Sequence, residues 1–199
     1  MAATSSACPF FDKLPAELRL EIYELSFKPA STEDEVDLCA VNPPSKSLLL
    51  TCGKAYNEAQ AIFKQAHRQH WSSSNFTMSL SGPASQKKEN RKHALLALAA
   101  LRGEDLQHIV HLTIIREELS TGEEGTNMKL LDRRGSWKCT WLYDGGTEDN
   151  LYFVLKPGVP YSDWRDFEVE DMVEWHANNW ETESMPVKQQ ITKVIQVLF

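Results

Sequence analysis

The most regular apolar pattern in the chain lies in residues 14–25. Leucine or isoleucine recurs there at intervals of four, four and three residues, at Leu14, Leu18, Ile22 and Leu25. This spacing predicts a helix with one apolar stripe, because positions three and four apart share a helix face. Pro15 suits the first turn, where its missing N–H leaves no hydrogen bond unmade. Residues 1–11 show no such pattern and are expected to form a flexible lead.

A second helical pattern begins near Ser45 or Ser47 and extends to about His70. Its apolar positions keep the helical period, at Leu48, Cys52, Ala55, Ala59, Ile62, Phe63 and Ala66. A glycine inside a helix costs about 1 kcal/mol relative to alanine, so Gly53 leaves open whether this is one helix or two. Between the two patterns, residues 28–46 carry three prolines and an acidic run, and we expect a loop there.

Shorter patterns of both kinds follow. Residues 75–80 alternate apolar and polar positions and predict a strand. Residues 86–102 carry leucines at helical spacing and predict a helix. Residues 106–115 are rich in β-branched side chains and predict a second strand. Residues 117–135 are polar and contain glycine, so we expect them to form a loop.

The last third of the chain predicts a hairpin and two helices. Residues 136–155 alternate aromatic with polar or smaller positions around a glycine-containing turn at 144–150, which is typical of a β-hairpin. Residues 163–183 are acidic, contain three tryptophans and allow a helix with one mixed face. Residues 187–198 keep a helical apolar period.

The order of these elements predicts the fold class. Helices come first, and strands mixed with helices follow, which favours an α+β fold with an antiparallel sheet packed on helices. We expect a helical region at residues 11–72 and an α+β region at residues 73–199, packed on the first as one unit. The 199 residues are 42% hydrophobic, which is enough to bury a core without disulfides or metals.

Charge is unevenly distributed along the chain. The formal net charge is -7, and an acidic protein repels phosphate backbones, so we expect no nucleic-acid partner. Residues 46–100 nevertheless carry eight basic and two acidic side chains, a balance of +6. This basic middle indicates either charge matching within the chain or a face for an acidic partner.

The N-terminus and the cysteines bear on location. The first residues lack a basic start and an apolar run of signal length, and no stretch reaches the ~18 apolar residues of a membrane helix. The four cysteines are widely spaced and form no CxxC pair. We therefore expect free thiols, no membrane association, and a cytoplasmic or nuclear location.

Two segments carry a resemblance to a known family. Residues 14–25 read LPAELRLEIYEL, and residues 48–63 read LLLTCGKAYNEAQAIF. Together they resemble the F-box, and especially the F-box-like proteins of filamentous fungi, in which an LPxELRxxIYEL helix precedes LLLTCRxxYxEAxxIF. The similarity continues in pattern to about residue 115. Two features depart from the family: the loop at residues 28–46 is longer, and Gly53 stands where the fungal pattern has arginine.

The resemblance implies a function in protein binding. An F-box is a small helical unit that docks on a Skp-type adaptor of a cullin ubiquitin ligase, while the rest of the chain holds a substrate. Such docking uses apolar anchors at helical spacing. By position, the anchors here would be Leu14, Pro15, Leu18, Ile22, Leu48, Leu49 and Cys52. The resemblance therefore implies a non-enzymatic interaction protein with no cofactor.

Two alternatives remain open at this stage. In the first, the protein is a free-standing α+β binding protein whose helical motif is structural; Leu14, Leu18 and Ile22 would then be fully buried against its own strands. Cys52, on an apolar helix position, would likewise be a core thiol. In the second, the chain is an enzyme, in which His176 would converge with Asp171 or Glu174 in a deep pocket.

Known catalytic and metal-binding patterns are missing from the sequence. It has no GxSxG, GxxxxGK[ST], GxGxxG or HExxH motif. His67 and His70 would share a helix face, but no third ligand accompanies them. His108 and His111, placed in a strand, would point to opposite faces. We therefore expect no metal site.

Overall fold

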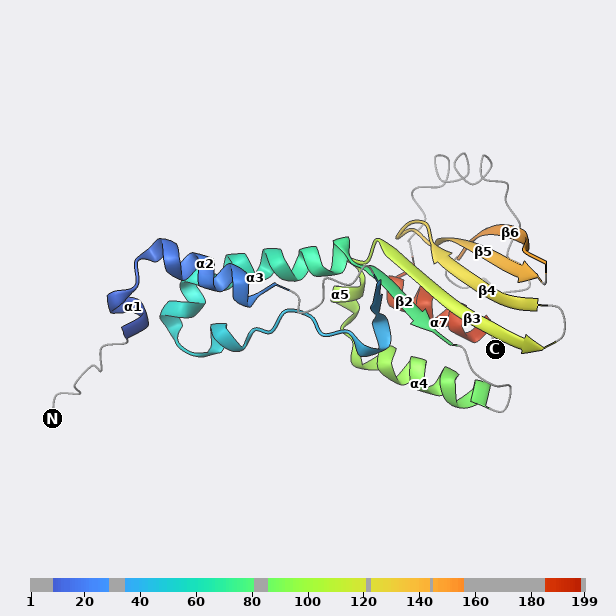
Figure 1. The fold of residues 1–199 in the computed structure, drawn as a ribbon, viewed down its shortest axis with the longest axis horizontal. Helices are drawn as coiled ribbons and strands as arrows, with labels where there is room; N and C mark the ends of the chain where they lie inside the picture. Colours follow the sequence, from blue (N-terminus) through green and yellow to red (C-terminus); the bar gives the residue numbers. More distant parts are fainter. Residues whose placement is uncertain are drawn as a thin grey trace. The chain divides into compact units, whose positions relative to one another are not determined.

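The computed structural model describes residues 9–28, 35–80, 86–120, 123–143, 145–155 and 185–197. These residues form two compact units (Figure 1). The helical unit contains the described residues 9–28 and 42–70, and the sheet unit contains residues 35–41 and the described residues from 71 onward. The chain thus begins in the helical unit, contributes residues 35–41 to the sheet unit, returns to the helical unit for residues 42–70, and continues in the sheet unit from residue 71.

The helical unit begins earlier than the sequence predicts. A short helix, α1 (Pro9–Lys13), precedes α2 (Ala16–Ser26), so the expectation of a flexible lead through residue 11 is wrong for its last residues. Pro15 stands immediately before α2 with φ -55° and ψ 152°, and its carbonyl accepts the first helical hydrogen bond from Arg19 N–H at 3.2 Å. Proline suits this position because its N–H is not needed there.

The second helical pattern is interrupted next to its glycine. A 3₁₀ turn, η2 (Ser47–Leu50), is followed by α3 (Gly53–Ser73), so a single helix from Ser45 or Ser47 is wrong. The Cys52 sulfur accepts a hydrogen bond from Ala55 N–H at 3.4 Å. This contact satisfies one of the backbone donors left open at the start of α3.

The sheet unit contains one six-stranded sheet. Its strands are β1 (Glu35–Asp37), β2 (Asn75–Ser79), β3 (His111–Ser120), β4 (Glu123–Leu130), β5 (Ser136–Tyr143) and β6 (Thr147–Val154). They lie in sequence order across the sheet. β1, β2 and β3 are parallel, and β3 to β6 form an antiparallel meander. The fold is therefore α+β, but the sheet is mixed rather than antiparallel throughout.

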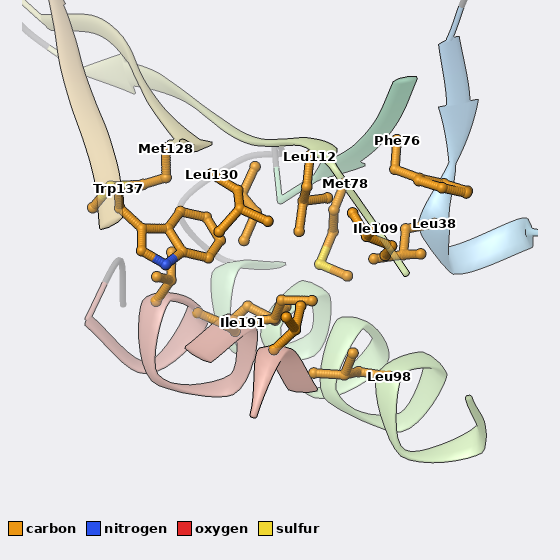
Figure 2. Packing of buried hydrophobic residues seen from close by; sticks show 14 of the residues in the cluster. Leu38, Phe76, Met78, Leu98, Ile109, Leu112, Met128, Leu130, Trp137 and Ile191 are labelled. Atoms are coloured by element: carbon orange, nitrogen blue, oxygen red, sulfur yellow. The ribbon is translucent and has the colours of Figure 1, made fainter. Parts of the chain in front are cut away.

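Helices cover one face of this sheet. They are the 3₁₀ turn η1 (Leu38–Ala40), α4 (Lys87–Ala100), α5 (Gly103–Leu106) and α7 (Val187–Val197). Figure 2 shows sheet residues such as Leu112, Leu130 and Trp137 pointing toward Ile191 of α7 and Leu98 of α4. Since α4 and α5 connect the parallel strands β2 and β3, the crossover itself brings helices onto the sheet.

Two segments predicted as loops form strands instead. Within residues 28–46, β1 pairs in parallel with β2, and Val36 packs against the core. Residues 117–135 contain the end of β3 and all of β4. These strands present polar side chains on their outer face, so their own sequences resemble loops. Their pairing with neighbouring strands makes them strands.

Other predictions agree with the structure, with shifted boundaries. The strand at 75–80, the helix at 86–102, the hairpin at 136–155 and the final helix appear as β2, α4, β5 with β6, and α7. The strand predicted from residue 106 begins at His111, because Leu106 ends α5. The predicted helix at 163–183 lies outside the described residues. None of the helices in the described ranges combines the length and apolar character needed to cross a membrane.

Candidate functional site

The inner face of α2 is built from aromatic residues. Tyr23 and Phe27 are fully buried with Leu49 and Ala59, and together they form the core of the helical unit. The Phe27 and Phe63 rings meet edge to face with their centroids 5.3 Å apart. This face, and not the leucine stripe, therefore joins α2 to α3.

A charged hydrogen-bond network locks the same face. Arg19 donates Nε and Nη2 hydrogen bonds to the two Glu58 carboxylate oxygens at 3.0 and 2.9 Å, and its Nη1 donates to the Leu14 carbonyl at 2.6 Å. The Tyr23 hydroxyl donates to Glu58 Oε2 at 3.1 Å. Bidentate arginine–carboxylate pairs fix orientation as well as distance. The network therefore fixes the rotation of α2 about its own axis.

The network shifts the pKa values of its members. The hydrogen bond from Arg19 lowers the pKa of Glu58 most, and the hydrogen bond from Tyr23 lowers it further, while burial acts in the opposite direction. Burial first, and then the hydrogen bond to Glu58, raises the pKa of Tyr23 to about 12. At neutral pH Glu58 is thus an ionised acceptor and the Tyr23 hydroxyl a protonated donor.

We expect Glu58→Gln to lower the urea midpoint of unfolding at pH 7 and to weaken its acid dependence. Because the folded state lowers the pKa of Glu58, its stabilisation is complete above the unfolded value of about 4.3 and is lost as pH falls through the folded pKa. The gap between wild type and variant should therefore narrow below about pH 4. Urea titrations followed by circular dichroism measure it, and a gap that is constant with pH contradicts the assignment.

The apolar stripe predicted on α2 faces solvent. Leu18 is 45% exposed, Ile22 37% and Leu25 64%, while Leu14 is partly buried and Pro15 is exposed. The burial of Leu14, Leu18 and Ile22 expected for a purely structural motif is therefore wrong. Leu18 and Ile22 each precede an inward-facing residue, Arg19 and Tyr23, by one position, which rotates the stripe by about 100° around the helix.

The residues proposed from the second segment are divided between core and surface. Leu49 is buried in the helical unit's core, and Leu48 packs against it partly buried. Cys52 is exposed, so the expectation of a core thiol is wrong; it lies just outside the first turn of α3 and not on its apolar face. Of these three residues, Cys52 is exposed, Leu48 is half-buried and Leu49 is buried.

Three exposed apolar residues of the helical unit were missed. Leu20, on α2, is 42% exposed. Leu50 is 72% exposed and Tyr56 is 44% exposed. Leu50 is one of three consecutive leucines, in which the helical period gives no sign of the exposed one. Tyr56 follows the buried Ala55 directly, so the helical period places Tyr56 off the apolar face of α3. The period does not indicate whether Tyr56 contacts another residue.

The residues considered for chemistry do not gather into a site in the described ranges. No group of three or more histidine, cysteine, aspartate or glutamate side chains that could hold a metal ion occurs there. His108 precedes β3 and His111 begins it. The expectation that both histidines lie in one strand is therefore wrong. Burial raises the pKa of Cys39 to about 11 and that of Cys139 to about 12, which keeps both thiols protonated.

The enzyme alternative rests on Asp171, Glu174 and His176, which lie outside the described residues. Within the described residues, the candidate site is the exposed apolar stripe of α2, whose inner face is held by the Arg19–Glu58 pair. Comparison of the chain with known protein families, with curated proteins and with solved structures finds no match.

Proposed function

We propose that the helical unit is an F-box-like interaction module and that the protein is a non-enzymatic substrate receptor of a cullin ubiquitin ligase. In this proposal the outer stripe of α2, formed by Leu14, Leu18, Ile22 and Leu25, docks on a Skp-type adaptor. The sheet unit then holds the substrate.

The exposure of the stripe is the observation that supports docking. Leu18, Ile22 and Leu25, three of the nine large apolar side chains that are exposed among the described residues, lie together on the stripe. Clustered exposed apolar residues are typical of surfaces that bind other proteins. Anchors at i, i+4 and i+7 fit the mode in which an amphipathic helix lies in a partner's groove.

The rigidity of α2 also favours a binding role. The Arg19–Glu58 pair and the Tyr23 hydroxyl hold the helix by its inner face, so the stripe is presented without a rearrangement. A preorganised surface loses less conformational entropy on binding than a mobile one. The same features would serve a free-standing binding protein, and the identity of the partner separates the two functions.

Calorimetric titration of the full-length protein with a purified Skp-type adaptor tests the proposal. We expect micromolar or tighter binding, weakened by at least about tenfold, or 1.4 kcal/mol, in the double variant Leu18→Asp, Leu25→Asp. Both side chains are exposed, so the variant should keep its fold. Unchanged far-ultraviolet circular dichroism verifies this.

Leu20→Asp is the matched control. Leu20 is exposed on the same helix, but it lies about 160° around the helix axis from each of the stripe residues Leu18 and Ile22. We expect this variant to bind the adaptor as the wild type does. The proposal fails if the wild type does not bind at about 100 μM adaptor, or if the control loses as much affinity as the double variant.

A further inference from the structure

The sheet face opposite the helices carries a row of polar side chains. The strand register aligns Asp37, Thr77, Thr113, Lys129, Lys138 and Tyr152 across all six strands. Their chain neighbours Met128 and Cys139 are buried on the helix-covered face, and alternation along a strand places the row on the other face. Lys129 is exposed, and Lys138 and Tyr152 are partly exposed. We call this surface the lysine face.

The two lysines stand directly opposite each other. Lys129 and Lys138 are register partners on the antiparallel strands β4 and β5, where opposite residues lie about 4.5–5.5 Å apart. Like charges in this arrangement destabilise a sheet. Neither ammonium forms an ion pair with another described residue; Lys138 instead lies 5.9 Å from the Tyr152 ring centroid. Among the described residues, no carboxylate compensates the repulsion between these two ammonium groups.

The lysines are surrounded mainly by uncharged side chains, and the carboxylate in their row is that of Asp37 on the edge strand β1, which accepts a hydrogen bond from Cys39 N–H at 2.8 Å. The next row of the same face reads Ser79, Ile115, Asn127, Thr140 and Asn150. Together the two rows carry a net charge of +1, from two lysines and Asp37, and the part contributed by β2 to β6 contains the two lysines and otherwise uncharged side chains. This composition contrasts with the chain as a whole, whose net charge is -7.

We propose that the lysine face binds an acidic, extended peptide segment of a partner protein. Two adjacent ammonium groups attract carboxylates, and alternate side chains of an extended peptide lie about 7 Å apart on one side, within reach of both lysines. Binding also relieves the repulsion between Lys129 and Lys138. Single-stranded nucleic acid fits less well, because Tyr152 is the only aromatic side chain in the two rows and stacking platforms need several.

Fluorescence anisotropy with the full-length protein tests this inference. The probe is a labelled peptide of alternating glutamate and serine, and the reference is its glutamine–serine counterpart. We expect the glutamate peptide to bind and the glutamine peptide to bind at least about tenfold more weakly. The double variant Lys129→Glu, Lys138→Glu should lose at least about tenfold in affinity for the glutamate peptide.

The matched control is Lys64→Glu, Lys88→Glu, which changes the net charge by the same amount at exposed positions of α3 and α4. We expect this control to keep its affinity within about twofold. Lys129→Gln, Lys138→Gln adds no negative charge and should also lose binding. A thermal midpoint at or above that of the wild type shows that the glutamine variant is folded, since the repulsion is gone.

Four outcomes overturn the inference. They are failure of the wild type to bind the glutamate peptide, equal weakening by the control, tighter binding of a single-stranded oligothymidylate, and a carboxyl-to-amine cross-link from Lys129 or Lys138 to this chain's own acidic residues 163–183 in the free protein. The last would assign the face to the chain itself. No adaptor is present in this assay, so its result and that of the docking experiment are independent.

Discussion

Replacing Trp137 with alanine is expected to lower the free energy of unfolding by about 3–5 kcal/mol. Trp137 is fully buried in β5, with Leu130 as its register partner on β4 and Phe153 on β6. Its indole points toward α7 (Figure 2). Truncation removes apolar contacts on both sides and leaves a cavity that the neighbouring strands cannot close. Since whole domains are stable by about 5–15 kcal/mol, chemical denaturation should show a large shift.

Gln190→Leu separates the polar part of this loss from the apolar part. The Trp137 indole N–H donates to Gln190 Oε1 at 3.1 Å, and Gln190 Nε2 donates to the carbonyls of Arg133 and Met185 at 3.0 and 2.6 Å. Leucine keeps a similar volume but leaves these buried groups without their amide partner, which costs about 1–3 kcal/mol. Trp137→Ala should therefore be the more damaging change. Equal losses, or a smaller loss for Trp137→Ala, would contradict a packed indole.

The helix at residues 14–25 shows how far periodicity can be trusted. The apolar period predicts α2 correctly, but the segment contains a second helical stripe, Arg19, Tyr23 and Phe27, whose first two members follow Leu18 and Ile22 by one position. Periodicity favours the leucine stripe as the inner face because it is purely apolar. The structure buries the aromatic stripe instead, since Arg19 finds Glu58 at 39 residues' distance along the chain. A long-range partner of this kind leaves no local signal.

The sheet was predictable where each strand carries its own pattern. The hairpin of β5 and β6 alternates strongly and has glycines in its turn, so its prediction is confirmed. β1 is only three residues long with acids at both ends, and its parallel partner β2 lies some 40 residues later. Parallel pairing depends on a distant strand and on a covering helix, neither of which a local window contains.

The candidate site was predictable in part for the same reason. Leu18 and Ile22 were identified as anchors, and their exposure fits that role. Leu49 was identified as well, but it fills the core beside Tyr23 and Phe27. Whether one of three consecutive leucines faces inward depends on where η2 ends and α3 begins. The sequence left that boundary open at Gly53.

Gly135→Ala is expected to destabilise the sheet unit by about 3 kcal/mol through two separate effects. Gly135 precedes β5 with φ 109°, a backbone conformation that residues with a Cβ rarely adopt. An added Cβ would also lie 2.7 Å from the Leu155 carbonyl oxygen, which is backbone and cannot rotate away. Gly135 is held there because its carbonyl accepts a hydrogen bond from Leu155 N–H at 2.8 Å. Urea unfolding of the variant measures the loss.

Two other glycines divide that loss into its parts. Gly145 has φ 95° but nothing within 4 Å of an added Cβ, so Gly145→Ala carries the conformational cost alone, about 1–2 kcal/mol. Gly53 has neither a positive φ nor a close neighbour, and Gly53→Ala should be neutral or stabilising by up to about 1 kcal/mol. If Gly135→Ala cost no more than Gly145→Ala, the close approach of the chain at Leu155 would not hold in solution. The loss in the Gly135 variant beyond that in the Gly145 variant therefore measures the steric cost of placing a Cβ against the Leu155 carbonyl oxygen.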